Sequence, residues 1–386
     1  MSDSPAIDEI TPDELYQAIH RGDPPLILDV RNEDEFANWA IEGLPPNSLL
    51  NIPYFVFLED EEGCLERVPR TRDVAVVCAK GGSSAFVASI LAQYGIRARN
   101  LRGGMIAWGD LHVTTRVASP HESGLTLFQI NRVGKRCLSY VIVSDGEALA
   151  IDPARHLDWY TSLAQVEQAR LTRVIDTHLH ADHLSGGPGL ARSLGIPYHI
   201  RLDDAAGAQF AYHSLEDGAH LALGSSVVEI IAIHTPGHTP GSTSLLVNEK
   251  YLLTGDTLFV SSIGRPDLGD KAEEWAQLLY RTLFDRMARL PDDVLILPAH
   301  YSGVAEMRHD GIVATTLGDA RQKNPVFQGR TEQEFLEFVL GHLPAQPSVY
   351  HEIRRANLGL IVFDAEHAIE AELGPNQCAA ALSRRV

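Results

Sequence analysis

The chain has 386 residues, 45% hydrophobic and 22% charged, which is enough for two globular domains with sizeable cores. Its formal charge of −19 argues against nucleic acid and anionic membranes as partners, because both would be repelled. No apolar run is as long as a membrane span, and the acidic N-terminal stretch does not look like an export signal. Four dispersed cysteines without a CxxC pair indicate neither a disulfide framework nor a cysteine zinc site, so we expect a cytoplasmic protein.

The first part of the chain alternates apolar runs with a helical stretch. Residues 25–30 (PLILDV) and 74–79 (VAVVCA) predict buried strands, because they are rich in Val, Ile and Leu without polar alternation. Residues 83–95 (SSAFVASILAQYG) predict a helix that stops at its final glycine. Strands that alternate with helices indicate a parallel α/β sheet. The periodicity is then lost over residues 109–124, which we predict to be a linker.

From residue 125 onward the pattern is richer in strands. Residues 125–153 contain consecutive apolar runs with turns at Gly134 and at Asp145-Gly146. Residues 271–290 predict an amphipathic helix between later strands. The expected organisation is an α/β domain over residues 1–115, followed over residues 116–386 by two sheets with flanking helices.

Cys78 ends the second predicted strand and precedes a glycine-bearing loop and the start of a helix. Such a turn directs backbone N–H groups toward an anion, so it would favour a thiolate or a persulfide on this cysteine. Lys80 would add positive charge. The other three cysteines lack this arrangement, and we expect structural roles for Cys64, Cys137 and Cys378.

Four runs in this part of the chain, LILDVRNEDEF, LLNIP, VVCAKGGSSA and LRGGMIAW, resemble a single rhodanese domain over residues 5–110. The resemblance implies a parallel sheet with flanking helices, and sulfane sulfur carried as a persulfide on Cys78. Thiosulfate, sulfite or a small thiol would be its sulfur partner. Ser83 stands where many rhodaneses have arginine, and Ala40 where histidine is common. The preferred sulfur donor therefore stays open.

The stretch DTHLHADHLSGG, residues 176–187, concentrates metal-binding side chains directly after a predicted strand. These are His178, His180, Asp182 and His183. Their spacing differs from the i, i+4 pair of a helical HExxH zinc site, so the stretch suits a loop. Three more candidates follow predicted strands elsewhere in the chain, in HTPGHTPGS, LLTGDT and ILPAH: His238, Asp256 and His300. We expect all of them on loops at one rim of the sheets.

The runs THLHADH, TPGHT, TGD and PAH resemble the metallo-β-lactamase superfamily over roughly residues 125–320. The resemblance implies an αββα sandwich with a metal site at one edge of its sheets. In members of the glyoxalase II type, all seven residues would hold two zinc ions that activate water against a thioester. This binuclear hydrolase is one of two functions compatible with the ligand set.

The other function is that of the persulfide dioxygenases, which this part of the chain also resembles. One iron(II) would be held by His178, His238 and Asp256, because two imidazoles and a carboxylate leave positions open for sulfur and dioxygen. The remaining four residues would orient these ligands or, in the hydrolase, bind a second metal. The reaction would oxidise the persulfide of glutathione or another small thiol to sulfite.

The run FVSSIGRPDLGD favours the dioxygenase branch, in which its arginine contacts the substrate's carboxylate. The matching residue is Arg265, held by Asp267. Glutathione-using members have a tyrosine two positions after the PAH histidine. Here that position is Ser302 and Tyr301 is displaced by one, so Tyr301 is the candidate substrate contact and the carrier thiol stays open.

We therefore predict a persulfide dioxygenase with one Fe(II) per chain and a rhodanese domain. A hydrolase with two zinc ions is the alternative. Residues 344–386 carry no motif that we can interpret, and we expect them to pack on the metal domain or on a second copy in a homodimer.

Overall fold

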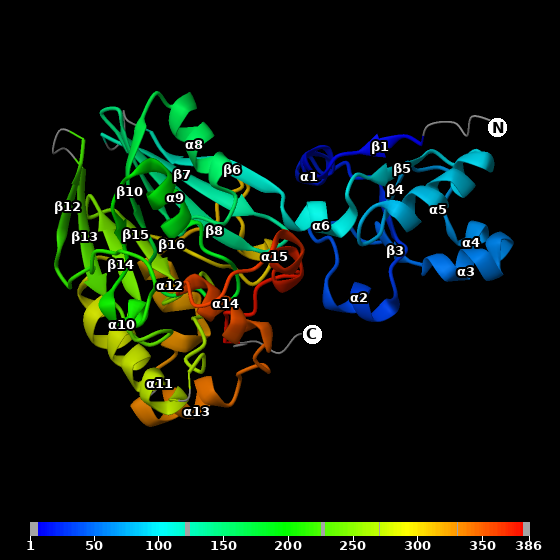
Figure 1. Ribbon diagram of the computed structural model, residues 1–386. Coiled ribbons are helices and arrows are strands. Elements are labelled where there is room, and N and C mark those ends of the chain that lie inside the picture. Colours follow the sequence, from blue (N-terminus) through cyan, green and yellow to red (C-terminus); the bar gives the residue numbers. More distant parts are fainter. Residues whose placement is uncertain (1–6, 120–123, 225–227, 270, 330, 381–386) are drawn as a thin grey trace. The chain divides into compact units, whose positions relative to one another are not determined.

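The structure is a computed structural model that describes residues 7–119, 124–224, 228–269, 271–329 and 331–380. It divides the chain into two compact units (Figure 1). The first comprises residues 1–112, 132–135 and 373–375, and the second comprises the rest. Among the described residues no helix has the length and apolar character of a membrane span.

The first unit is built on a five-stranded parallel sheet, as predicted. Its strand order is β1-β5-β4-β2-β3, with every pairing parallel. The strands are β1 (Glu9–Ile10), β2 (Leu26–Asp29), β3 (Leu49–Asn51), β4 (Val74–Val77) and β5 (Ala98–Leu101). The helices are α1 (Pro12–His20), α2 (Glu33–Asn38), α3 (Tyr54–Glu59), α4 (Glu61–Arg67), α5 (Gly82–Gln93) and α6 (Gly104–Gly109). Every residue of β2 and β4 is buried, which explains their uninterrupted apolar runs.

The first sheet of the second unit has the order β11-β10-β9-β8-β7-β6. Its strands are β6 (His112–Ala118), β7 (Thr126–Arg132), β8 (Cys137–Ser144), β9 (Glu147–Ile151), β10 (Arg170–Ile175) and β11 (Tyr198–His199). The predicted linker over residues 109–124 is therefore wrong for residues 112–118, which form β6. As an edge strand, β6 buries only its two end residues, so it lacks the apolar signal of a buried strand.

The second sheet has the order β12-β13-β14-β15-β16-β17. Its strands are β12 (His220–Leu223), β13 (Val228–His234), β14 (Thr243–Val247), β15 (Tyr251–Gly255), β16 (Leu295–Pro298) and β17 (Thr315–Thr316). The other helices of this unit are α8 (Leu157–Val166), α9 (Gly187–Leu194), α10 (Leu202–Ala205), α11 (Ala272–Arg281), α12 (Leu317–Lys323), α13 (Glu332–Leu340), α14 (Val349–Asn357) and α15 (Ala365–Ala371). The predicted helix at 271–290 is α11, continued by short helical turns to residue 289.

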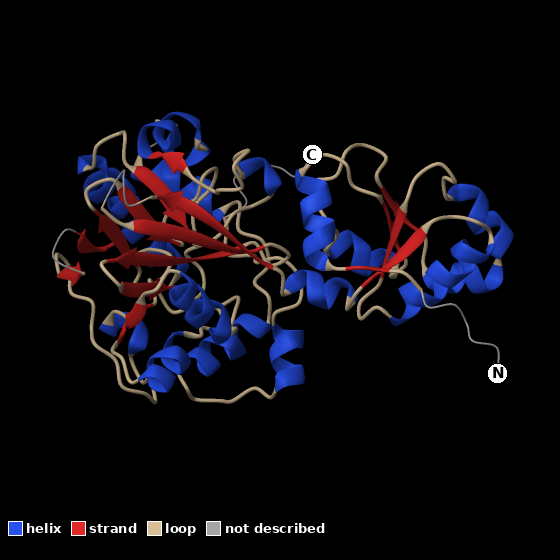
Figure 2. Ribbon diagram, turned by 90° about the horizontal axis from the view of Figure 1, so that it is seen from above, coloured by secondary structure: helices blue, strands red, loops and turns tan. Residues whose placement is uncertain are grey.

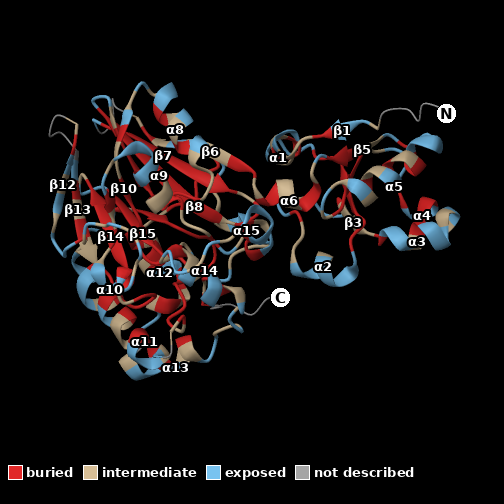
Figure 3. Ribbon diagram, in the orientation of Figure 1, coloured by how far each residue is buried: buried red, intermediate tan, exposed pale blue. Residues whose placement is uncertain are grey.

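Three apolar clusters stack these elements into the predicted αββα sandwich (Figure 2). The central cluster joins the inner faces of the two sheets, for example Ile142 with Leu245. An outer cluster joins the first sheet to α8 and α9, and another joins the second sheet to α11, α12 and α13. Figure 3 shows the resulting pattern of buried strands beneath helices with exposed outer faces.

Candidate metal centre and persulfide site

The seven predicted metal-binding residues come from loops that follow strands. His178 comes three residues after β10, Asp256 follows β15 directly, and His300 lies two residues beyond β16. His238 stands in the loop between β13 and β14. Because β10 belongs to one sheet and β13 to β16 belong to the other, the site brings loops of both sheets together.

His178, His238 and Asp256 form a compact triad. Asp256 Oδ2 lies 3.3 Å from His238 Nε2 and 3.6 Å from His178 Nε2, and all three side chains are at most 1% exposed. None of these three atoms has a hydrogen-bond partner. A buried polar atom without a partner costs about 1–3 kcal/mol, so three that converge require a compensating charge. A divalent cation meets this requirement, and the donor set fits non-haem iron.

Hydrogen bonds on the far side of each imidazole direct both histidines inward. His238 Nδ1 donates to the carbonyl of Arg265 at 2.9 Å. His178 Nδ1 lies 2.9 Å from Thr177 Oγ1, which itself donates to the Asp152 carboxylate. Because the single hydroxyl proton goes to Asp152, Thr177 accepts from His178. Both Nε2 atoms are thereby left with free lone pairs that face Asp256.

Two glycines permit this close convergence. A Cβ on Gly264 would lie 1.9 Å from the Asp256 carbonyl oxygen and 2.8 Å from His238 Nδ1. Gly255 has φ +52°, and a Cβ there would lie 2.6 Å from Thr177 Oγ1. Any larger residue would push the ligand loops apart.

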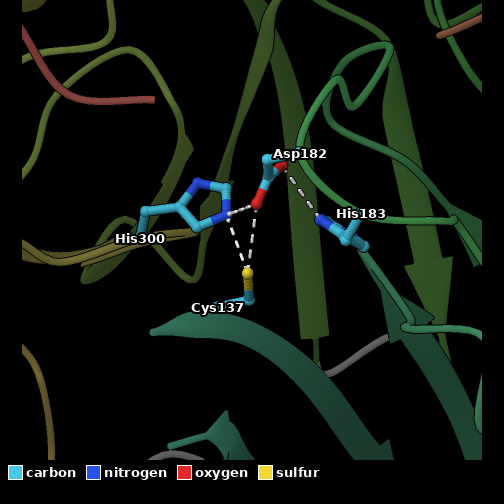
Figure 4. A group of neighbouring side chains, drawn as sticks. All are labelled: Cys137, Asp182, His183 and His300. Atoms are coloured by element: carbon cyan, nitrogen blue, oxygen red, sulfur yellow. Dashed lines mark hydrogen bonds and ion pairs between the residues drawn. The ribbon is translucent and has the colours of Figure 1, made fainter. Parts of the chain in front are cut away.

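Cys137, Asp182, His183 and His300 form a second cluster beside the triad (Figure 4). His300 Nε2 lies 3.0 Å from Asp182 Oδ2, and its Nδ1 lies 2.5 Å from Asp256 Oδ1. Burial lowers the pKa of His300, but Asp182 and Asp256 outweigh this and raise it well above its usual value. His300 is therefore an imidazolium that donates to both carboxylates. Asp182 and His300 therefore have partners within the protein, whereas the three triad atoms have none.

The remaining predicted residue, His180, belongs to a third group with Asp152 and Asp176. His180 Nε2 lies 3.1 Å from Asp152 Oδ1. Burial lowers the pKa of His180, whereas Asp152 and Asp176 raise it, to about 9. His180 thus holds Asp152, the carboxylate that accepts from Thr177, and Thr177 in turn orients His178.

Arg265, the predicted contact for a substrate carboxylate, is fully buried and engaged within the protein. Its guanidinium donates to both carboxylate oxygens of Asp267 at 2.6 and 2.8 Å. It also donates to the carbonyls of Pro344 and Gln377. The structure thus presents Arg265 as an anchor for the C-terminal residues, and its predicted contact with substrate stays a prediction.

Tyr301 and Lys80 are the two other predicted substrate contacts. Tyr301 is part of the core between the sheets, and its hydroxyl donates to Asn131 Oδ1 at 3.2 Å. Lys80 is exposed on the loop after Cys78. Neither placement tests a role in substrate binding.

Cys78 stands between β4 and α5, as predicted. Its Sγ accepts from the Gly81 N–H at 3.1 Å and lies 3.0 Å from Ser84 Oγ. Ser84 is fully buried and also contacts Asn100 Oδ1 at 2.7 Å. A backbone N–H and a hydroxyl next to the sulfur are suited to a thiolate or a persulfide.

Several residues that arrange the metal centre have no recognisable sequence motif. Asp204 accepts from the N–H groups of Leu179 and Gly241 and from Thr239 Oγ1, so it joins the loops of His178 and His238. Asn357 of α14 donates to the carbonyls of His180 and His183. Since these partners are distant in sequence, only the fold brings them together.

Cys137 and Cys378, for which we expect structural roles, both lie against His300. Cys137 Sγ is 3.1 Å from His300 Nε2 and 3.2 Å from Asp182 Oδ2. The Cys378 sulfur and ligand atoms of Asp256 and His300 all lie within 4.8 Å of one another. Two protein thiols therefore lie at the metal centre.

Comparisons with known proteins agree with both domains. Residues 132–300 match the metallo-β-lactamase superfamily, and residues 11–111 match the rhodanese-like domain. The chain is 34% identical over 201 residues to the mitochondrial persulfide dioxygenase ETHE1 of Homo sapiens, covering 51% of this chain and 72% of that protein. It is 31% identical over 183 residues to a hydroxyacylglutathione hydrolase of Haemophilus ducreyi, covering 47% and 73%.

A solved structure, that of ETHE1 from Myxococcus xanthus, is also similar. Its TM-score is 0.53 at 26% identity, and the match covers 60% of this chain and 96% of that one. This chain therefore belongs to the metallo-β-lactamase superfamily and carries a rhodanese-like domain at its N-terminal side.

Proposed function

We propose that the chain is an iron-dependent persulfide dioxygenase that oxidises the persulfide of a small thiol to sulfite, and that its rhodanese domain carries sulfane sulfur on Cys78. The observation that carries this proposal is the difference between two neighbouring clusters. The three triad atoms lack hydrogen-bond partners, whereas Asp182 and His300 bond to each other and to Asp256. This difference favours one metal ion over two.

The residues of the triad would hold Fe(II) on one side through two neutral imidazoles and one carboxylate. Bound iron would supply the redox chemistry with dioxygen that no side chain can supply. The protein's own contribution is orientation. The Arg265 carbonyl and Thr177 fix the two histidines, while His300 holds Asp256 Oδ1 and leaves Oδ2 without a partner, so that Oδ2 would be the oxygen that holds the metal.

The hydrolase remains the second candidate function, because all seven residues that two metals need are present and a hydrolase relative is 31% identical. Paired assays on the purified full chain distinguish the two. Oxygen uptake that depends on glutathione persulfide, with sulfite as product, supports the dioxygenase. Cleavage of S-lactoylglutathione without oxygen uptake would replace it by the hydrolase.

A further inference from the structure

The segment between α14 and α15, residues 358–363, is fixed to the second unit on both of its sides. We call this segment the apolar tip. Directly before it, the side-chain amide of Asn357 donates to the carbonyls of His180 and His183, each at 2.9 Å. Beyond α15, the carboxylate of Glu372 accepts from the Leu184 N–H at 2.7 Å. Because both Asn357 and Glu372 are buried, the tip is held in a defined position.

The side chains of the apolar tip face the solvent. Its sequence, LGLIVF, contains no polar side chain, and none of its six residues is buried. Val362 is 92% exposed and Leu360 is 47% exposed. The backbone is nevertheless ordered, since the Leu358 carbonyl accepts from the Gln209 N–H at 2.8 Å and the Leu360 N–H donates to the Arg355 carbonyl at 2.9 Å. A continuous run of exposed apolar residues at a fixed position marks a binding surface.

Charged side chains of opposite sign flank the apolar tip. Arg355 precedes it and Glu366 follows it, and both are exposed. Within the part of the chain that the structure describes, neither side chain has an ion-pair or hydrogen-bond partner. Their charged neighbours are engaged, because Arg354 donates to a carbonyl and Asp364 accepts from an N–H at the start of α15. The tip therefore has one free cation on one side and one free anion on the other.

We propose that the apolar tip is the contact surface of a homodimer, in which the tips of two chains pack about a two-fold axis. A two-fold contact joins the same patch of both copies in opposite directions, so Arg355 of each copy would face Glu366 of the other. The same contact would remove Val362 and Leu360 from water. The tip lies outside residues 132–300, which match the metallo-β-lactamase superfamily, so this surface is not part of the shared fold.

A membrane is the other partner that an exposed apolar loop could have, and the charges disfavour it. Attraction to an anionic membrane needs an excess of positive charge beside the loop. Here Arg354 and Arg355 are balanced by Asp364 and Glu366, and the whole chain carries −19. Repulsion between two such chains is screened beyond about 8 Å at physiological salt, so the local pairing decides whether the tips associate.

Sedimentation velocity of the full chain tests the proposal. A tip of six residues is small beside a standard interface of about 1,600 Å², so we expect a dissociation constant on the order of 10 µM. Between about 1 and 100 µM the wild type should change from mostly monomer to mostly dimer. Val362→Asp, which places a charge inside the contact, should stay monomeric over the whole range. Val166→Asp, at a residue that is 75% exposed on α8, is the matched control and should dimerise as the wild type does.

A charge exchange tests the two-fold arrangement itself. Arg355→Glu should raise the dissociation constant of the dimer by at least about tenfold, because two carboxylates would then face each other on each side of the axis. Adding Glu366→Arg to the same chain should restore the wild-type dissociation constant, since both pairs are then reversed. Circular dichroism of each variant checks that its fold is unchanged.

Three results would overturn the inference. The first is a wild type that stays monomeric at about 100 µM, a measurement that does not depend on whether any variant folds. The second is a dimer that Val362→Asp leaves intact, because it would form through another surface. The third is monomeric protein that floats with phosphatidylcholine vesicles and loses this binding in Val362→Asp, which would make the tip a membrane contact.

Discussion

At the scale of single residues, the metal centre is defined by three buried atoms whose lone pairs point toward the same place. His178 Nε2, His238 Nε2 and Asp256 Oδ2 lie close together with no donor among them. Burial raises the pKa of Asp256, but His300, His178 and His238 lower it below the usual range, so the carboxylate is charged. An anionic oxygen between two imidazole lone pairs is what a divalent cation stabilises.

The substitution Asp256→Ala should abolish metal binding, since it removes the triad's only negative charge. Elemental analysis of the purified variant should find metal at less than about a tenth of the wild-type content. Glu229→Ala, which removes an exposed carboxylate from the same sheet, is the matched control and should keep full metal content. Unchanged iron in Asp256→Ala would show that the ligand assignment is wrong.

Thr177→Val tests the chain from Asp152 to His178. Loss of the hydroxyl leaves His178 Nδ1 without its acceptor, so the imidazole is free to turn or to change tautomer. Competition with a chelator should show metal affinity lower by about 10–100-fold. Thr172→Val, on β10 just before the loop of Thr177 and bonded to a sheet carbonyl, should bind metal as the wild type does. Equal affinity in both variants would contradict the proposed orienting role.

At the scale of elements, the loops that carry the metal ligands could be predicted from the sequence. The residues that hold these loops in place could not. Apolar runs ending at Asp176, Asp256 and His300 marked strands whose ends meet at one rim. The Pro344 and Gln377 carbonyls that accept from Arg265 carry no pattern, because carbonyl acceptors look alike in any sequence. The edge strand β6 escaped prediction for a related reason, since most of its residues are only partly buried.

Arg265→Ala should loosen the C-terminal residues that Arg265 holds through the Pro344 and Gln377 carbonyls. It breaks the ion pair of the buried Arg265 with the partly exposed Asp267 and removes donors to two carbonyls, at a cost of about 3 kcal/mol in the free energy of unfolding. Urea denaturation followed by intrinsic fluorescence should measure this loss. Arg308→Ala removes an exposed partner of Asp310 and should change stability by no more than about 0.5 kcal/mol. Similar midpoints of urea denaturation for the two variants would show that Arg265 does not hold the C-terminal residues in place.

At the scale of the molecule, the chain combines two candidate sites on different folds. The parallel sheet positions Cys78 between β4 and α5, and the αββα sandwich gathers its ligands from both sheets. Both architectures were predictable from motif order and strand pattern. The thiols at the metal centre were not, because Cys137 and Cys378 are 241 residues apart by number (378 minus 137) and neither lies in a motif.

The two sites should be separable by substitution. Cys78→Ser should lose sulfur transfer from thiosulfate to cyanide yet keep persulfide-dependent oxygen uptake, because the triad remains intact. Cys64→Ser, which alters a buried cysteine of the same domain, should keep both activities. If Cys78→Ser also lost oxygen uptake with small persulfides, the metal site would depend on sulfur delivered through the rhodanese domain.

The central claim is that one redox metal is held by three residues. Metal identity and stoichiometry, measured on full-length protein purified without air, test it most directly. The account predicts one iron per chain. Two zinc ions per chain would contradict it and would identify a water-activating hydrolase instead.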